Sequence, residues 1–274
     1  MRVAVIGGGR MGAGIAQVFL AAGDHVTVQE PQAEAARWRI AEGLAIAESK
    51  GLVGRDEALT RLAVAAGTAA GVPADADLVI EAVPEDAALK VQVLAEAEAT
   101  VGDDAVLATN TSSLSIAELG SALDRPERLI GLHFFNPVPV QRLVEIVVTG
   151  ATPAAVLDRA RGHVERIGKA SVVVNDSPGF ATSRLGVLLG LEAIRMVEEG
   201  VASAEDIDTA MTLGYGHPMG PLKLSDLVGL DVRLAIAGYL HARLGPRFEP
   251  PALLREKVAA GELGRKTGKG FYQW

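Results

Sequence analysis

A histidine and a glutamate stand in one short, proline-punctuated segment, GLHFFNPVPVQRLVEIV, at residues 131–147. Two apolar runs flank the prolines, which is the pattern of a hairpin with a loop longer than two residues. In an antiparallel pairing centred on Pro139, His133 and Glu145 lie directly opposite each other, because each is six residues from that proline. Opposed side chains share one face of a sheet and have Cβ atoms about 5 Å apart, so the carboxylate could reach the imidazole.

A carboxylate beside an imidazole is suited to proton transfer. An imidazole with a pKa near neutrality can take the proton of a substrate hydroxyl, and a neighbouring carboxylate can fix the tautomer of the ring and stabilise the imidazolium. The spacing alone leaves a structural alternative open, an edge hairpin that carries a surface ion pair, since ion pairs without catalytic function also perturb histidines.

A glycine-rich turn, GGGRMG at residues 7–12, follows a strand pattern and opens a helical pattern. In such a unit Gly7 makes the tight turn, Gly9 lets the backbone approach a pyrophosphate, and Gly12 permits close packing of helix on strand. The amino end of the helix then faces the phosphates. Met11 lies inside this turn and is counted among the expected cofactor contacts.

Glu30 ends the second strand pattern, HVTVQE, eighteen residues after Gly12. A carboxylate at that place accepts hydrogen bonds from the adenosine ribose and repels a 2′-phosphate, which favours NAD over NADP. Arg10 argues in the other direction, because a guanidinium near the phosphates could hold an extra phosphate. A purely structural alternative has the glycines turning the chain and Glu30 capping a solvated strand end.

The elements that must position these residues alternate through the first half of the chain. Strand-like and helical runs follow one another in RVAVIG, MGAGIAQVFLAAG, HVTVQE, DADLVIEAVP, DAALKVQVLAEAEAT and AVLATNTS. This alternation predicts a Rossmann-like, doubly wound and mostly parallel sheet, whereas helical runs dominate after about Asp176. We therefore expect an α/β fold with an NAD-binding domain over residues 1–177 and an all-α domain over residues 178–274.

Composition argues against several other classes of protein. The chain has 274 residues, 49% of them hydrophobic, and no apolar run of the roughly 18 residues that a membrane span needs, so we expect a soluble, cytoplasmic globular protein. We see no secretory signal at the amino terminus. A net charge of −8 argues against nucleic-acid binding. With no cysteine and five histidines outside any zinc pattern, no metal site is expected.

Long ordered blocks of the sequence resemble the L-3-hydroxyacyl-CoA dehydrogenase family, including its bacterial 3-hydroxybutyryl-CoA dehydrogenases. The blocks are NTSSLSI (110–116), GLHFFNPVPV (131–140), LVEIV (143–147), NDSPGF (175–180), EDIDTAMTLGYGHPMGPLKLSDLVGLD (205–231) and GRKTGKGFY (264–272). The resemblance implies an NAD-dependent enzyme of fatty acid β-oxidation type that interconverts (3S)-3-hydroxyacyl-CoA and 3-ketoacyl-CoA. It also implies a helical domain that closes the acyl-CoA cleft and forms a homodimer.

The same resemblance implies roles for individual residues. His133 would be the catalytic base, Glu145 would orient it, and Ser112 would bind the 3-oxygen of the substrate. For Ser112 the alternative is a helix cap, because SSLSIAEL could begin a helix. Further contacts to the cofactor are implied for Glu85, Lys90, Asn110, Asn136 and Lys266, and a contact to the coenzyme A phosphates for Lys50. For Lys50 and Lys90 the alternative is a solvated surface charge.

One residue departs from the family pattern. PGFATSRL places Ser183 where the family carries an asparagine, the fourth member of its catalytic constellation. A hydroxyl is shorter than an amide and needs a water to bridge the same gap, so this fourth contact is in doubt. Two other functions stay open: a dehydrogenase of a non-CoA hydroxy acid, and a protein that binds NAD(H) without turnover.

Overall fold

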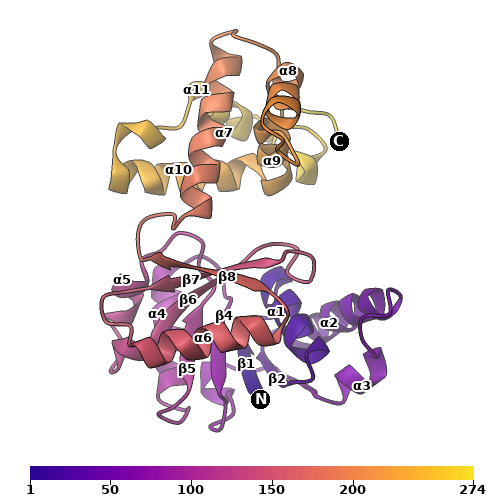
Figure 1. Cartoon of the computed structure of the whole chain (residues 1–274), viewed down its shortest axis with the longest axis vertical. Coiled ribbons are helices and arrows are strands. Elements are labelled where there is room, and N and C mark those ends of the chain that lie inside the picture. The colour runs from indigo at the N-terminus through magenta and orange to yellow at the C-terminus, as the bar shows by residue number, and fades with distance from the viewer. The chain divides into compact units, whose positions relative to one another are not determined.

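The computed structural model describes all residues from Met1 to Trp274, and they form two compact units (Figure 1). The first unit is Met1–Asp176 and contains every strand of the sheet. The second unit is Ser177–Trp274 and is built from helices. The predicted fold class, a Rossmann-like α/β domain followed by an all-α domain, is therefore confirmed.

The first unit is organised around one eight-stranded sheet in the order β3-β2-β1-β4-β5-β6-β7-β8. Neighbouring strands run parallel except β6 and β7, which are antiparallel. The strands are β1 (Arg2–Ile6), β2 (His25–Gln29), β3 (Leu62–Ala65), β4 (Leu78–Glu81), β5 (Val106–Thr109), β6 (Leu129–Phe134), β7 (Leu143–Val148) and β8 (Ala170–Asn175).

Helices cover both faces of this sheet, which explains why its central strands are apolar on both sides. The α1, α2 and α6 helices share one hydrophobic core with the sheet, and α4 packs on β4 and β5. The helices are α1 (Arg10–Ala21), α2 (Ala33–Glu48), α3 (Arg55–Leu59), α4 (Ala87–Glu98), α5 (Ile116–Gly120) and α6 (Ala154–Arg166), with 3₁₀ turns η1 (Ala69–Gly71) and η2 (Pro126–Arg128).

The strand order reverses at the centre of the sheet. From β1 the chain proceeds outward to β2 and β3, and it then returns to β4 on the other side of β1. In open α/β sheets a ligand cleft forms at the carboxyl ends of the strands where the order reverses. The glycine-rich turn lies at this place, between β1 and α1.

The second unit packs its helices around a separate hydrophobic core. Local signals explain where some of them begin: Ser203 caps α8, since its hydroxyl accepts a hydrogen bond from the backbone N–H of Asp206 at 3.1 Å. The elements are α7 (Thr182–Glu198), α8 (Ala204–Thr209), the π-helical turn η3 (Ala210–Gly214), α9 (Pro221–Val228), α10 (Leu230–Leu244), η4 (Pro246–Phe248), α11 (Ala252–Ala259) and η5 (Arg265–Thr267). None of the chain's helices combines the length and the apolar character that crossing a membrane requires.

Candidate active site

The predicted pairing of His133 with Glu145 is confirmed. The two residues are directly opposed in the antiparallel β6–β7 pair, and His133 Nδ1 lies 2.7 Å from Glu145 Oε2. His133 is 7% exposed and Glu145 is fully buried. Because β6 is flanked by β5 and β7, and β7 by β6 and β8, the alternative of an edge hairpin with a surface ion pair is wrong.

The imidazole is held from several sides. The ring of Phe135 lies 4.5 Å from that of His133, centroid to centroid, at an interplanar angle of 48°. Asn110 ties the end of β5 to the end of β6, because its Oδ1 accepts the backbone N–H of Phe134 at 2.9 Å. Glu145 thus engages Nδ1 of the imidazole, and Nε2 is the other ring nitrogen.

Ser112 lies in the loop that follows β5, at the same carboxyl edge of the sheet as His133. Glu85 Oε1 accepts the backbone N–H of Ser112 at 3.0 Å and faces its Oγ at 3.4 Å. The helix cap is a different serine: Ser115 begins α5, and its Oγ accepts the N–H of Glu118 at 3.2 Å. The helix-cap alternative for Ser112 is therefore wrong, and its hydroxyl is placed in a loop between β5 and α5.

Two charged residues on this edge are buried in one network. Lys90 is 1% exposed and Glu81 is fully buried, and Lys90 Nζ lies 2.7 Å from Glu81 Oε1. The alternative of a solvated surface charge is therefore wrong for Lys90. Sequence reasoning did not single out Glu81, although an acid at the end of an apolar strand pattern, LVIE, was a usable signal.

The surroundings of Glu85 lower its pKa. Partial desolvation by burial raises this pKa, but the Lys90 charge and the hydrogen bonds from the Thr111 hydroxyl and the backbone N–H of Ser112 outweigh desolvation. Thr111 Oγ1 donates to Glu85 Oε1 at 2.6 Å. The carboxylate of Glu85 is therefore ionised at neutral pH and acts as an acceptor toward the Ser112 loop.

The glycine-rich turn has the geometry that the sequence predicts for it. Gly7 has φ +98°, and a Cβ there would lie 2.7 Å from the carbonyl oxygen of Ala82, so only glycine fits. A Cβ on Gly12 would lie 1.8 Å from the carbonyl oxygen of Gly7, which shows how closely α1 packs on the end of β1. A Cβ on Gly9 would meet nothing within 4 Å, so its backbone faces open space.

That open space is a cavity of about 560 Å³ at the carboxyl ends of the strands. Glu30 lies in its wall directly after β2, which ends at Gln29, one residue earlier than the sequence pattern indicates. Glu30 Oε2 accepts the backbone N–H of Gly8 at 2.7 Å, so the carboxylate is already oriented. Gly7, Gly9, Arg10 and Met11 also line the cavity. Its volume and its exposed backbone at a helix N-terminus fit the adenosine and pyrophosphate part of a dinucleotide.

A second cavity, of about 470 Å³, lies between α1, α2 and the loop that joins β6 to β7. Lys50 and Asn136 both line it, as do Arg10 and Arg39, and Trp38 contributes a side chain that is 64% exposed. Cations beside an exposed indole can hold an anionic ligand that also has apolar surface. Lys50 is exposed just after α2. Its contact with the coenzyme A phosphates and the alternative of a solvated surface charge therefore both stay predictions.

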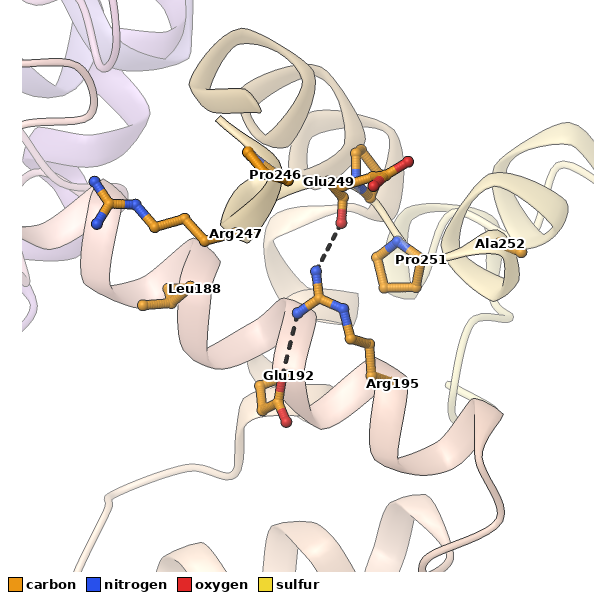
Figure 2. A pocket seen from close by; sticks show the side chains of 9 residues that line it. Leu188, Glu192, Arg195, Pro246, Arg247, Glu249, Pro251 and Ala252 are labelled. Atoms are coloured by element: carbon orange, nitrogen blue, oxygen red, sulfur yellow. Dashed lines mark hydrogen bonds and ion pairs between the residues drawn. The ribbon is translucent and has the colours of Figure 1, made fainter. Parts of the chain in front are cut away.

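The remaining predicted site residues lie in the helical unit. Ser183 is the second residue of α7 and is partly buried, and Lys266 lies in η5 with Nζ 2.5 Å from Asp231 Oδ2. A cavity of about 530 Å³ in this unit is lined by neither of them (Figure 2). Its Arg195 is satisfied by Glu192 at 3.2 Å and by the carbonyl oxygen of Glu249 at 2.8 Å. That cavity therefore has no evident part in the chemistry.

Both units match known families. Residues 2–177 match the family model described as 3-hydroxyacyl-CoA dehydrogenase, NAD binding domain, and residues 179–274 match 3-hydroxyacyl-CoA dehydrogenase, C-terminal domain. A 3-hydroxybutyryl-CoA dehydrogenase of Mycobacterium tuberculosis is 47% identical over 100% of this chain and 98% of its own length.

Solved structures agree along the whole chain. The crystal structure of M. tuberculosis FadB2 has a TM-score of 0.95 at 46% identity, and covers 100% of this chain and 98% of its own. That of (S)-3-hydroxybutyryl-CoA dehydrogenase PaaH1 from Ralstonia eutropha has a TM-score of 0.94 at 37% identity, with the same coverage of 100% and 98%. Two family domains in the expected order and relatives aligned from end to end show that the chain belongs to the NAD-dependent 3-hydroxyacyl-CoA dehydrogenase family.

Proposed function

We propose that this enzyme interconverts (3S)-3-hydroxyacyl-CoA and 3-ketoacyl-CoA, with acyl chains of four carbons among its substrates, and that His133 is the general base. The observation that carries the proposal is the buried contact of 2.7 Å between His133 Nδ1 and Glu145 Oε2. His133 lies near the end of β6, at the carboxyl edge where the Ser112 loop follows the parallel strand β5. The curated relatives that act on 3-hydroxybutyryl-CoA support the substrate class.

In the oxidative direction the proton of the 3-hydroxyl group passes to His133 Nε2, while a hydride leaves C3, the carbon that carries this hydroxyl group. NAD, when bound, supplies the acceptor for that hydride. Glu145 stabilises the imidazolium that forms, since an opposite charge beside a cation in a buried site favours the charged state. The Ser112 hydroxyl donates a hydrogen bond to the 3-oxygen, and so stabilises the charge that develops there. In reduction the same groups act in reverse, and His133 returns its proton to the 3-oxygen.

Two cavities would hold the two ligands, and Arg10 lines both of them. Asn136 lines the same cavity as Lys50. The cavity at Gly9 and Glu30 would take the adenosine half of NAD. Asn110, Asn136, Glu85 and Lys266 are proposed for the nicotinamide side of NAD, whereas Lys90, buried with Nζ 3.3 Å from Glu85 Oε2, would act only through Glu85. The cavity that Lys50 lines would take the phosphates of coenzyme A.

Exposed apolar side chains in the helical unit support a homodimer formed through that unit. Monomers rarely expose so many large apolar side chains on a few neighbouring helices. They are Leu185, Leu188 and Leu189 of α7, Leu224, Leu227 and Val228 of α9, and Val232 of α10. We also propose a cytoplasmic location, on the ground that the chain is similar to bacterial 3-hydroxybutyryl-CoA dehydrogenases.

A spectrophotometric assay with acetoacetyl-CoA and NADH tests the proposed function. Oxidation of NADH that depends on the acyl-CoA supports it. Turnover of a free 3-keto acid with none of its CoA thioester would indicate a dehydrogenase of non-CoA hydroxy acids. NADH binding without turnover of any 3-ketoacyl-CoA from four carbons upward would indicate a binding protein.

We predict a preference for NADH over NADPH of at least roughly tenfold in kcat/KM, equivalent to about 1.4 kcal/mol. The reason is the oriented carboxylate of Glu30, which repels a 2′-phosphate. Kinetics with both cofactors measure the ratio, and Glu30→Gln should narrow it, whereas Glu34→Gln on the exposed first turn of α2 should not. Equal or better kinetics with NADPH would contradict the prediction and turn attention to Arg10.

Ser183→Asn is predicted to change kcat/KM for acetoacetyl-CoA by no more than about 2 to 3 kcal/mol in either direction, the scale of one hydrogen bond to a charged group. The longer amide either restores a contact or clashes in a pocket shaped for serine. Steady-state kinetics of both proteins give the value, with the NADH dissociation constant as the control. A larger change would mean that Ser183 contributes more than one hydrogen bond.

A further inference from the structure

A fully buried ion pair lies outside the residues to which the mechanism assigns chemistry. Glu81 ends β4 and is 0% exposed, and Lys90, on α4, is 1% exposed. Charged side chains are almost never buried to this degree unless paired. Such a pair is weak evidence for stability, because well-packed apolar residues of similar volume often serve a fold equally well. Its position at the carboxyl edge of the sheet therefore calls for an explanation other than stability.

The carboxylate of Glu81 is held at both oxygens. Oε1 accepts from Lys90 Nζ at 2.7 Å and from the backbone N–H of Val83 at 2.7 Å. Oε2 accepts from Thr109 Oγ1 at 2.6 Å. Thr109 is the register partner of Glu81 in the parallel β4–β5 pair, so the contact follows from the sheet itself. A fully satisfied buried network of this kind is rigid.

The ammonium of Lys90 has an acceptor for each of its three protons. Glu81 Oε1 lies at 2.7 Å, the carbonyl oxygen of Val83 at 3.2 Å, and Glu85 Oε2 at 3.3 Å. An ammonium has three donors and no acceptor, so these contacts use all of them. The side chain of Lys90 is therefore buried, and Glu85 is the residue that connects it to the Ser112 loop.

Glu85 continues the network on its other oxygen. Glu85 Oε1 faces the hydroxyls of Thr111 at 2.6 Å and Ser113 at 3.2 Å, and the backbone N–H of Ser112 at 3.0 Å. Charge alternates along the path from Glu81 through Lys90 to Glu85. Each contact along this path is a hydrogen bond or an ion pair. The last contact joins Glu85 to the loop that carries Ser112, the serine expected to bind the substrate oxygen.

We propose that Glu81 is a positioning residue for the dehydrogenase reaction: it fixes Lys90, Lys90 fixes the Glu85 carboxylate, and Glu85 fixes the loop that carries Ser112. The inference rests on the proposed function of Ser112. Glu81 itself touches neither ligand in this scheme, and its effect is transmitted through the geometry of the loop. Loss of its charge leaves Glu85 as the only carboxylate beside Lys90, which draws the Glu85 carboxylate away from Ser112.

The test compares Glu81→Gln with Asp24→Asn, which changes a matched buried carboxylate at the amino ends of the strands. Asp24 is also 0% exposed and also paired, with Arg166 at 2.8 Å and the N-terminal amine at 2.9 Å, but it lies just before β2. Each variant is measured for melting temperature, NADH dissociation constant, and kcat and KM with acetoacetyl-CoA. Both should lower the melting temperature.

Only Glu81→Gln should lower kcat, by about ten- to hundredfold, the scale of a misplacement by about 1 Å at a reacting centre. Its NADH dissociation constant should change far less than its kcat, because the adenosine half of NADH is expected at Gly9 and Glu30. Asp24→Asn should keep the wild-type kcat. The double variant Glu81→Gln/Lys90→Met removes both charges of the pair and should regain melting temperature, yet its kcat should stay low because Glu85 then has no cation to hold it.

Two results would overturn the inference. One is a Glu81→Gln variant that folds and keeps kcat within twofold of the wild type. The other is a double variant that recovers kcat together with its melting temperature, which would reduce the pair to a structural role. The double variant decides the matter if Glu81→Gln alone does not fold. A wild-type protein inactive toward acetoacetyl-CoA would instead defeat the proposed function, so the two failures are distinguishable.

Discussion

His133→Ala is expected to lower kcat for reduction of acetoacetyl-CoA by about 10²- to 10⁴-fold, the contribution of a positioned general acid or base. NADH binding should stay close to that of the wild type. His133, as the proposed base, is expected to face the reacting oxygen, whereas the adenosine half of the cofactor is expected at Gly9 and Glu30, on a different part of the carboxyl edge of the sheet. Stopped-flow single turnovers and NADH fluorescence titration measure the two quantities separately.

The control for this experiment is His25→Ala. His25 is exposed and begins β2 at the opposite edge of the sheet, so kcat should not change. Glu145→Gln should lose less activity than His133→Ala, since the amide keeps the shape but weakens stabilisation of the imidazolium. A His133→Ala protein with more than half of the wild-type activity would remove this residue from the mechanism.

Gly12→Ala is expected to impair both folding stability and cofactor binding. A Cβ there lies 1.8 Å from the carbonyl oxygen of Gly7, so the backbone of the turn must shift. Overpacking of this kind costs about 1 to 3 kcal/mol of stability. Affinity for NADH should fall at least about tenfold, because the N–H groups that face the pyrophosphate move with the turn. Denaturant unfolding and fluorescence titration measure the two effects.

Gly9→Ala separates the effect on cofactor binding from the effect on folding stability, which Gly12→Ala combines. A Cβ on Gly9 meets nothing within 4 Å, so the free energy of unfolding should not change, while NADH affinity should still fall because the methyl group occupies the approach of the pyrophosphate. Gly162→Ala on α6, where a Cβ also meets nothing, should leave NADH affinity unchanged and raise the free energy of unfolding by about 0.5 to 1 kcal/mol, because alanine favours a helix interior. Normal NADH affinity in both Gly9→Ala and Gly12→Ala would place the dinucleotide elsewhere.

The parts of the site that could be predicted from the sequence are those fixed by local geometry. His133 and Glu145 are symmetric about one proline-containing loop, and a hairpin has only one way to bring them face to face. The glycine-rich turn is likewise contained in one strand–turn–helix unit, and its sterics repeat those of any such unit. Alternation of strands and helices was enough to give the fold class.

The parts that could not be predicted depend on contacts between distant elements. Glu81 meets Thr109 only because β4 and β5 are parallel in a particular register. Lys90 lies on a helix of mixed polarity, and only the position of α4 on the sheet decides that its ammonium is buried. Strand β8 was not predicted either, because it is one of the two edge strands, its residues are mostly exposed, and its apolar run lacks an alternating pattern.

The hydrogen bond between His133 and Glu145 lies between two interior strands rather than in a loop. Strands β5 and β8 pair with the outer sides of β6 and β7, and a slip of one residue would turn both side chains to the other face of the sheet. The hydrogen-bonded pair therefore persists for as long as the sheet itself does. Evolution or engineering can rebuild the surrounding loops without changing this pair, and conversely cannot change the pair without altering the core.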